Sequence, residues 1–199
     1  MSGGTAVLQR LYDWTMGLAG HRHALPVLAA ISFIESSIFP IPPDVLLIPM
    51  VLAARERAWL IAAVCTVASV AGGYAGYAIG YFLYEALGQP ILEFYGALGQ
   101  FAEFRGLYNE WGAWIVGMAG FTPFPYKVIT IASGVTQLDP TTFGIASALS
   151  RGARFFLVAA LLWRFGEPIR RFVEANLPTL AWLFFALVLA GFLSVRYLF

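Results

Sequence analysis

Five charged residues lie inside strongly apolar stretches of this sequence. Two are carboxylates and three are cations: Glu35, Asp44, Lys127, Arg151 and Arg154. A charged side chain within an apolar, membrane-length segment is costly, faces the interior of a helix bundle and is a candidate functional group. Guanidinium groups bind phosphate and carboxylate through paired hydrogen bonds. We therefore expect the three cations to bind an anionic group, with phosphate as the best fit, and the two carboxylates to be candidates for carrying protons.

The same five residues also have structural interpretations, which the sequence leaves open. Asp44 and Lys127 would form an ion pair that joins two segments. Arg151 and Arg154 are three residues apart and so share one helix face. From there they would neutralise the two carboxylates or cap free backbone carbonyls.

The composition indicates that lipid is the main solvent of this chain. Of its 199 residues, 60% are hydrophobic and 12% charged, against about 25% charged in soluble domains. The net charge of +1 and the lack of a basic run predict no nucleic-acid partner. The lone Cys65 provides neither a disulfide framework nor a zinc motif. Since no serine–histidine pair or metal cluster occurs at membrane depth, we expect no catalytic residue, metal or cofactor, and no enzymatic activity.

Three segments have the roughly 20 apolar residues that a membrane-spanning helix needs: 58–87, 140–165 and 177–199. Two further apolar regions, 23–54 and 112–138, are interrupted by "FPIPP" and "TPFPY". The helix-breaking residues are Pro40, Pro42, Pro43, Pro123 and Pro125. Broken backbone at membrane depth must be buried in protein or line a wet cavity. Each break therefore predicts a re-entrant helical hairpin, and a pair of kinked spanning helices is the alternative.

The two halves of the chain resemble each other. "FPIPPDVLLI" aligns with "FTPFPYKVITI" after one insertion, and "SVAGGYAGYAIGYFLYEALGQPI" aligns with "SALSRGARFFLVAALLWRFGEPI" without gaps. The alignment places Asp44 opposite Lys127. Inverted repeats in transporters put the binding site where the broken helices meet. In the first copy, Gly72, Gly76 and Gly80 have the spacing that lets helices pack closely.

The predicted fold is an all-α polytopic membrane protein. It is an inverted repeat of two re-entrant helical hairpins, each followed by a long transmembrane helix, plus a C-terminal transmembrane helix. Residues 1–22 form an amphipathic interfacial helix, 23–170 the main domain with repeats at about 23–91 and 112–169, and 171–199 the final span. Residues 93–112 would form an interfacial helix between the repeats. Most arginines fall on one side of this topology, which the positive-inside rule makes cytoplasmic, as is the N-terminus.

The motifs "FIESSIFPIPPDVLLIP", "GGYAGYAIGYFLYEALG", "FTPFPYKVITIASGV" and "RGARFF" together resemble the DedA family of bacterial inner-membrane proteins. That family belongs to the VTT-domain (SNARE-associated Golgi) superfamily, and the order of motifs is most similar to its YqaA-like branch. The resemblance covers roughly residues 28–170. It implies two facing re-entrant hairpins, and transport or flipping of lipid.

The resemblance also bears on individual residues. The family's acidic pair corresponds to Glu35 and Asp44. Of its two arginines around the second break, the first is replaced by Gly120 and the second lies one place from Lys127. The resemblance implies an anionic lipid, such as a polyprenyl phosphate or phospholipid, as the partner, with protons as the candidate coupling ion. A proton- or cation-coupled exporter of small solutes, an enzyme acting on lipid phosphates and a purely structural membrane protein remain as alternatives. The sequence does not specify an oligomeric state.

Overall fold

The computed structural model describes residues 23–38, 42–122, 124–166 and 168, and every regular element in these ranges is helical. The predicted segments 1–22 and 171–199, together with Pro40 and Pro123, lie outside the described residues. The elements are α2 (Ala24–Ser37), α3 (Asp44–Ala53), a 3-10 turn (Arg55–Arg57), α4 (Ala58–Leu83), a π-helical turn (Tyr84–Gly88), α5 (Gln89–Phe94), α6 (Leu98–Phe121), α7 (Tyr126–Val135) and a long helix, Pro140–Gly166.

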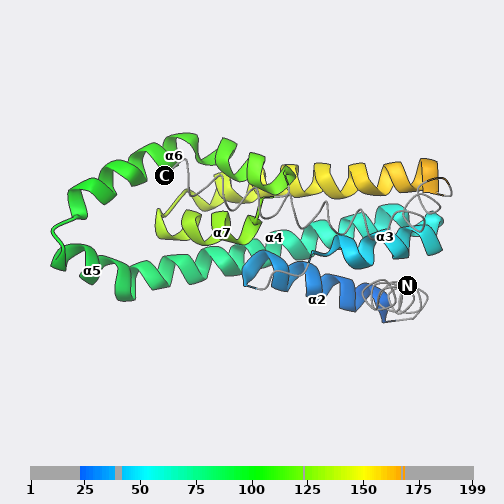
Figure 1. Cartoon of the computed structure of the whole chain (residues 1–199), viewed down its shortest axis with the longest axis horizontal. Helices are drawn as coiled ribbons and strands as arrows, with labels where there is room; N and C mark the ends of the chain where they lie inside the picture. Colours follow the sequence, from blue (N-terminus) through cyan, green and yellow to red (C-terminus); the bar gives the residue numbers. More distant parts are fainter. Residues whose placement is uncertain (1–22, 39–41, 123, 167, 169–199) are drawn as a thin grey trace, which may run out of the picture.

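Two pairs of helices form antiparallel hairpins that enter the bundle from opposite ends (Figure 1). In the first, α2 runs toward the middle of the bundle and α3 returns to the end where α2 began. In the second, α6 runs inward from the other end, and the shorter α7 turns back toward that end. Each hairpin bends at a proline-containing segment: α3 begins directly after Pro42 and Pro43, and α7 directly after Pro125. Proline has no backbone N–H to donate and disfavours the helical conformation of the residue before it, so the helix is interrupted at both bends.

Each hairpin leads into a long helix, and these two long helices run antiparallel to each other (Figure 1). The helical stretches Arg55–Phe94 and Pro140–Gly166, of 40 and 27 residues, are long and apolar enough to cross a membrane. The first continues through Gly88 and Pro90, where the sequence suggested that the helix ends. A π-helical turn and the position of Pro90 at the start of α5 accommodate the proline without a break.

Helix α4 packs closely against both hairpins through its glycines. A Cβ atom built on Gly72 would lie 2.1 Å from the carbonyl oxygen of Phe33 in α2. One built on Gly80 would lie 2.0 Å from the carbonyl oxygen of Ile131 in α7. Between them, Gly76 faces the side chain of Thr130 in α7. Only glycine permits these backbone approaches, so one stripe of α4 joins the two hairpins.

Helix α6 differs from the sequence-based expectation. Residues 93–112 were expected to form an interfacial helix separate from the first arm of the second hairpin. The structure instead has one continuous helix from Leu98 to Phe121. No proline interrupts this range, and its glycines at 99, 106, 112, 117 and 120 are tolerated within the helix.

Apolar side chains fill the interior and also cover much of the outside. One buried cluster joins α2, α3 and α4 with the C-terminal half of the Pro140–Gly166 helix. A second joins α6 and α7 with the N-terminal half of that helix. Large exposed aromatic and aliphatic residues occur on every long helix, including Trp59, Phe82, Trp114, Leu149 and Trp163. An apolar surface this extensive is typical of proteins that contact a membrane or a partner.

Candidate functional site

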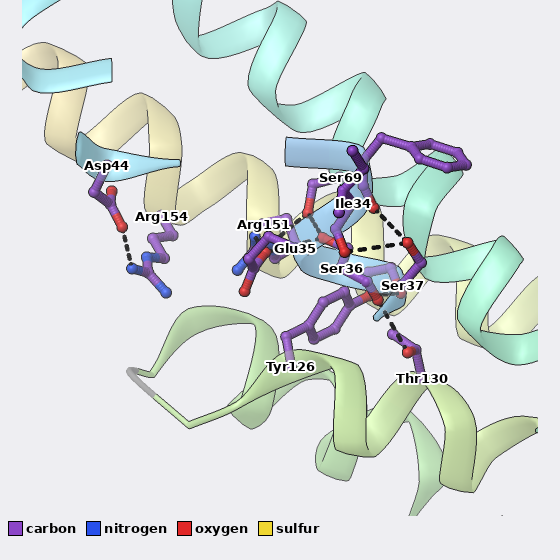
Figure 2. A network of polar contacts seen from close by, with 12 residues as sticks. Ile34, Glu35, Ser36, Ser37, Asp44, Ser69, Tyr126, Thr130, Arg151 and Arg154 are labelled. Carbon is purple, nitrogen blue, oxygen red and sulfur yellow. Dashed lines mark hydrogen bonds and ion pairs between the residues drawn. The ribbon is translucent and has the colours of Figure 1, made fainter. Parts of the chain in front are cut away.

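Four of the five charged residues singled out in the sequence meet where the two hairpins bend: Glu35, Asp44, Arg151 and Arg154 (Figure 2). Glu35 lies in the last turn of α2, and Asp44 is the first residue of α3. Arg151 and Arg154 lie on one face of the Pro140–Gly166 helix, which passes both bends. The structure forms two ion pairs from these four residues, Glu35 with Arg151 and Asp44 with Arg154.

The Glu35–Arg151 pair is buried and part of a closed ring of hydrogen bonds. Nη2 of Arg151 donates to Oε2 of Glu35 at 2.8 Å, and Nε of Arg151 donates to Oγ of Ser69 at 2.6 Å. The Ser69 and Ser36 hydroxyls lie 2.6 Å apart, and Ser36 Oγ donates to Glu35 Oε2 at 3.1 Å. The side chains of Arg151 and Glu35 are 2% and 16% exposed. We call these four residues the buried ring.

The chemistry of the groups fixes the direction of each hydrogen bond in the buried ring. Arginine can only donate, so Ser69 must accept from it. An ionised carboxylate can only accept, so Ser36 must donate to Glu35. Ser69 therefore donates to Ser36.

Two aromatic rings flank the Arg151 guanidinium. Its Cζ lies 4.9 Å from the ring centroid of Tyr126 and 4.7 Å from that of Phe155. Such cation–π contacts are strongest when the cation is removed from water. The Tyr126 hydroxyl in turn donates to Oγ of Ser147. Two nitrogens of Arg151 donate hydrogen bonds to protein groups, and aromatic rings pack against its guanidinium. Arg151 is therefore held in one position and is poorly placed to bind a ligand.

The Asp44–Arg154 pair is more accessible. Nη2 of Arg154 donates to Oδ2 of Asp44 at 2.6 Å, and the two side chains are 21% (Asp44) and 23% (Arg154) exposed. Nη1 of Arg154 donates weakly, at 3.3 Å, to the carbonyl oxygen of Thr122, which caps the end of α6. Arg154 therefore bridges the bends of both hairpins. Asp44 also lies at the N-terminus of α3, where the helix dipole stabilises a carboxylate.

Lys127 does not pair with Asp44, although the repeat alignment placed them at matching positions. It lies in the first turn of α7 and is half-buried. Among the described residues, no carboxylate forms an ion pair with it. A cation in this position adds to the positive end of the helix dipole. The ion pair that Asp44 does form is with Arg154, one of the pairings that the sequence left open.

A further hydrogen bond ties the two hairpins together beside the buried ring. The Thr130 hydroxyl of α7 lies 3.1 Å from the carbonyl oxygen of Ser36 at the end of α2, and also 2.9 Å from that of Lys127 (Figure 2). Together with the Gly76 contact, this links α2, α4 and α7 at one point. Pro42, Pro43 and Pro125, the helix-breaking prolines within the described residues, lie at the bends directly before α3 and α7.

Sequence reasoning missed the neutral members of the site. Ser36, Ser69, Tyr126 and Thr130 are fully buried. Their signal is a hydroxyl in an otherwise apolar window, which is weak because serine and threonine can also bond to their own helix backbone. Within the described residues, no group of three His, Cys, Asp or Glu side chains is placed to hold a metal ion.

Two bacterial proteins are similar to this chain over most of its length. An uncharacterized protein of Haemophilus influenzae is 39% identical over 172 residues, which cover 86% of this chain and 89% of that protein. An uncharacterized protein of Histophilus somni is 36% identical over 168 residues, which cover 82% of this chain and 87% of that protein. No protein-family profile matches the chain, and no solved structure matches it.

Proposed function

The chain belongs to the same family as these two uncharacterized bacterial proteins, and we propose that it moves an anionic, phosphate-bearing lipid across the bacterial inner membrane. The observation that supports this proposal is the partly exposed Asp44–Arg154 pair at the bends of two opposed helical hairpins. Transporters build their sites from broken helices that meet near the middle of the bilayer. Under the same proposal the chain is a member of the DedA family, as the resemblance of its motifs implies.

The proposed membrane arrangement has re-entrant hairpins. The stretches Arg55–Phe94 and Pro140–Gly166 span the bilayer, and a further span lies at 177–199. Helices α2, α3 and α7, of 14, 10 and 10 residues, are too short to cross a hydrocarbon core that needs about 20. Arg55 and Arg57 begin the first stretch, and Arg164 lies near the end of the second. These two helix ends adjoin each other, because a Cβ atom built on Gly166 would lie 2.7 Å from Nη2 of Arg55. By the positive-inside rule this end is cytoplasmic.

In the proposed mechanism, lipid phosphate and Asp44 compete for Arg154. The guanidinium offers donors that suit either partner, and it holds Asp44 through a single ion-pair contact. Protonation of Asp44 would weaken that contact and release Arg154 for the phosphate. Lys127 in the first turn of α7 adds a second positive charge that an anion would neutralise. Proton uptake at Asp44 is thereby coupled to lipid binding.

The buried ring has a different role in this proposal. It joins the end of α2 to α4 and to the Pro140–Gly166 helix, and Arg151 positions the site without contacting the lipid. This revises the sequence-based expectation that Arg151 joins Arg154 and Lys127 in binding phosphate, and that Glu35 carries protons alongside Asp44. The reason is burial: Arg151 already donates to Glu35 and Ser69.

A reconstituted system tests the proposed function. The purified full chain is placed in vesicles of phosphatidylcholine that contain a fluorescent phosphatidylglycerol. Movement of this lipid between the leaflets is followed by adding a quencher that reaches only the fluorophores in the outer leaflet. We expect faster movement than in empty vesicles, loss of this increase with Arg154→Gln, and an unchanged rate with Arg164→Gln, an exposed arginine on the same helix. Equal rates for Arg154→Gln and the unmodified chain would refute the role of Arg154. If no phosphate-bearing lipid moves but small cations leave the vesicles in an acid-dependent way, the result would favour the alternative of a proton- or cation-coupled exporter of small solutes.

A further inference from the structure

An apolar groove runs along the outside of the bundle between α6 and the Pro140–Gly166 helix. Its volume is about 540 Å³, within the range of about 300–1,000 Å³ typical of small-ligand sites. Its lining combines small residues, Ala113, Gly117 and Ala146, with large apolar ones, Trp114, Phe121 and Leu149. A Cβ atom built on Gly117 would meet no other atom within 4 Å, so the space beside this glycine is open.

The groove leads toward the charged site. Its lining on the long helix extends from Thr142 to Ser150, which corresponds to about 12 Å of helix at 1.5 Å per residue. On α6 it ends at Phe121. The next residue, Thr122, is the one whose carbonyl accepts a hydrogen bond from Arg154. One end of the groove therefore adjoins the accessible arginine, and the other points away from it along the bundle.

We propose that this groove holds the hydrocarbon tail of the anionic lipid while Arg154 holds its head group. The inference rests on the proposed function and specifies how the substrate lies in the site. The chemistry of the groove supports this proposal, because an apolar groove that ends at a cation is complementary to a molecule with a long apolar tail and a negatively charged head group. Trp114 and Leu149, 70% and 69% exposed, leave the groove open to the side from which a membrane lipid would enter.

Photolabelling of the full chain tests the tail site directly. Phosphatidylcholine vesicles that contain the protein receive either a phosphatidylglycerol probe or a neutral diacylglycerol probe that lacks the phosphate, each with a photoreactive diazirine in its acyl chain. Labelled peptides are then identified by mass spectrometry. We expect residues 113–121 and 142–150 to be labelled about tenfold more by the anionic probe, the preference expected of one charge-assisted contact to Arg154. Arg154→Gln should remove the preference and leave labelling at the level of the neutral probe.

Filling the groove provides the matched comparison. Gly117→Leu places a side chain in the open space, and Gly106→Leu makes the same change on the same helix at another open position outside the lining. We expect the first to lower groove labelling by the anionic probe severalfold and the second to leave it unchanged, with similar unfolding temperatures for both. Equal labelling by both probes would identify ordinary boundary lipid and overturn the proposal. Absence of groove labelling, as expected if residues 177–199 cover the groove, would also overturn it.

The outcomes separate this inference from the proposed function. Lipid movement that requires Arg154 but is unaffected by Gly117→Leu would leave the function standing and remove the tail site. Labelling that prefers the anionic probe and is lost in Gly117→Leu, without any lipid movement, would leave the tail site standing and remove the transport function.

Discussion

Replacing Glu35 with glutamine is expected to destabilise the fold strongly, because it leaves the Arg151 guanidinium charged, buried and without a counter-ion. The two side chains are 16% and 2% exposed. Removing one partner of a buried ion pair costs about 3–5 kcal/mol. The Asp44–Arg154 pair is more exposed, at 21% and 23%, and exposed pairs contribute about 0–1 kcal/mol. The same neutralisation at Asp44 should therefore have a much smaller effect.

Thermal unfolding of the purified full chain in detergent measures the difference. For a chain of this length 1 kcal/mol corresponds to about 2–4 °C, so Glu35→Gln should lower the unfolding midpoint by about 6–20 °C and Asp44→Asn by less than about 4 °C. Glu103→Gln is the control, because Glu103 is exposed on α6 and the chemical change is identical. It should leave the midpoint unchanged.

A double replacement distinguishes loss of a counter-ion from loss of a contact. Substituting both members of a buried pair by apolar side chains of similar size is often neutral or stabilising. Glu35→Leu combined with Arg151→Met should therefore recover most of the stability that Glu35→Gln loses. The reasoning fails if Glu35→Gln and Asp44→Asn lower the midpoint equally, or if the double variant is no more stable than the single one.

Three further predictions concern packing, the buried ring and acid stability. Gly80→Ala should cost about 1–3 kcal/mol of stability, since its Cβ would lie 2.0 Å from an α7 carbonyl oxygen; Gly106→Ala, at an open position, should be neutral or stabilise by about 0.5–1 kcal/mol. Equal unfolding midpoints would contradict this. Ser69→Ala leaves Nε of Arg151 without its acceptor and should cost about 1–3 kcal/mol in the same assay, whereas no change would argue against the ring. A backbone N–H at the start of the Pro140–Gly166 helix lowers the pKa of the Asp139 carboxyl. The stability that the ionised Asp139 carboxyl contributes is therefore complete above its unfolded pKa of about 3.9, and it is lost as the pH falls through the lower folded pKa. Below about pH 4 the unfolding midpoint of Asp139→Asn should fall less than that of the unmodified chain. Identical acid dependence of the two proteins would exclude this role.

The helical elements follow from local signals in the sequence. Apolar windows of membrane length mark the long helices, and the prolines at 42, 43 and 125 mark two of the bends, because both signals act within a few neighbouring residues. The helix boundaries were less predictable. Pro90 continues a helix through a π-helical turn, and α6 extends without interruption across Gly112. Gly112 is buried and packs closely against Leu138, whereas no residue from Tyr84 to Phe94 is buried; at Pro90 the local π-helical geometry, and not packing, continues the helix.

The partners within the site could be narrowed from the sequence but not assigned. Placing Arg151 and Arg154 on one helix face made a pairing with Glu35 and Asp44 available as an alternative. The repeat alignment favoured Asp44 with Lys127, and the structure pairs Asp44 with Arg154 instead. Which cation a carboxylate meets depends on how far each helix is displaced along its neighbours, and no local pattern encodes that displacement. The serines of the buried ring were missed for the same reason.

The central claim is that the two bends meet around the buried charges, and cross-linking between them tests it most directly. In a Cys65→Ala background, which removes the only native thiol, cysteines replace Ser36 and Thr130. The Thr130 hydroxyl lies 3.1 Å from the backbone carbonyl oxygen of Ser36. A short bifunctional thiol reagent applied to the full chain in membranes should join them within one chain. In the control pair, Thr142 replaces Thr130 as the partner of Ser36. Thr142 lies nine residues, about 13 Å along the helix, before Arg151, the residue of the long helix that is linked to Ser36 through Ser69, so this pair should remain separate. Efficient cross-linking of the control pair, or none between 36 and 130, would contradict the account.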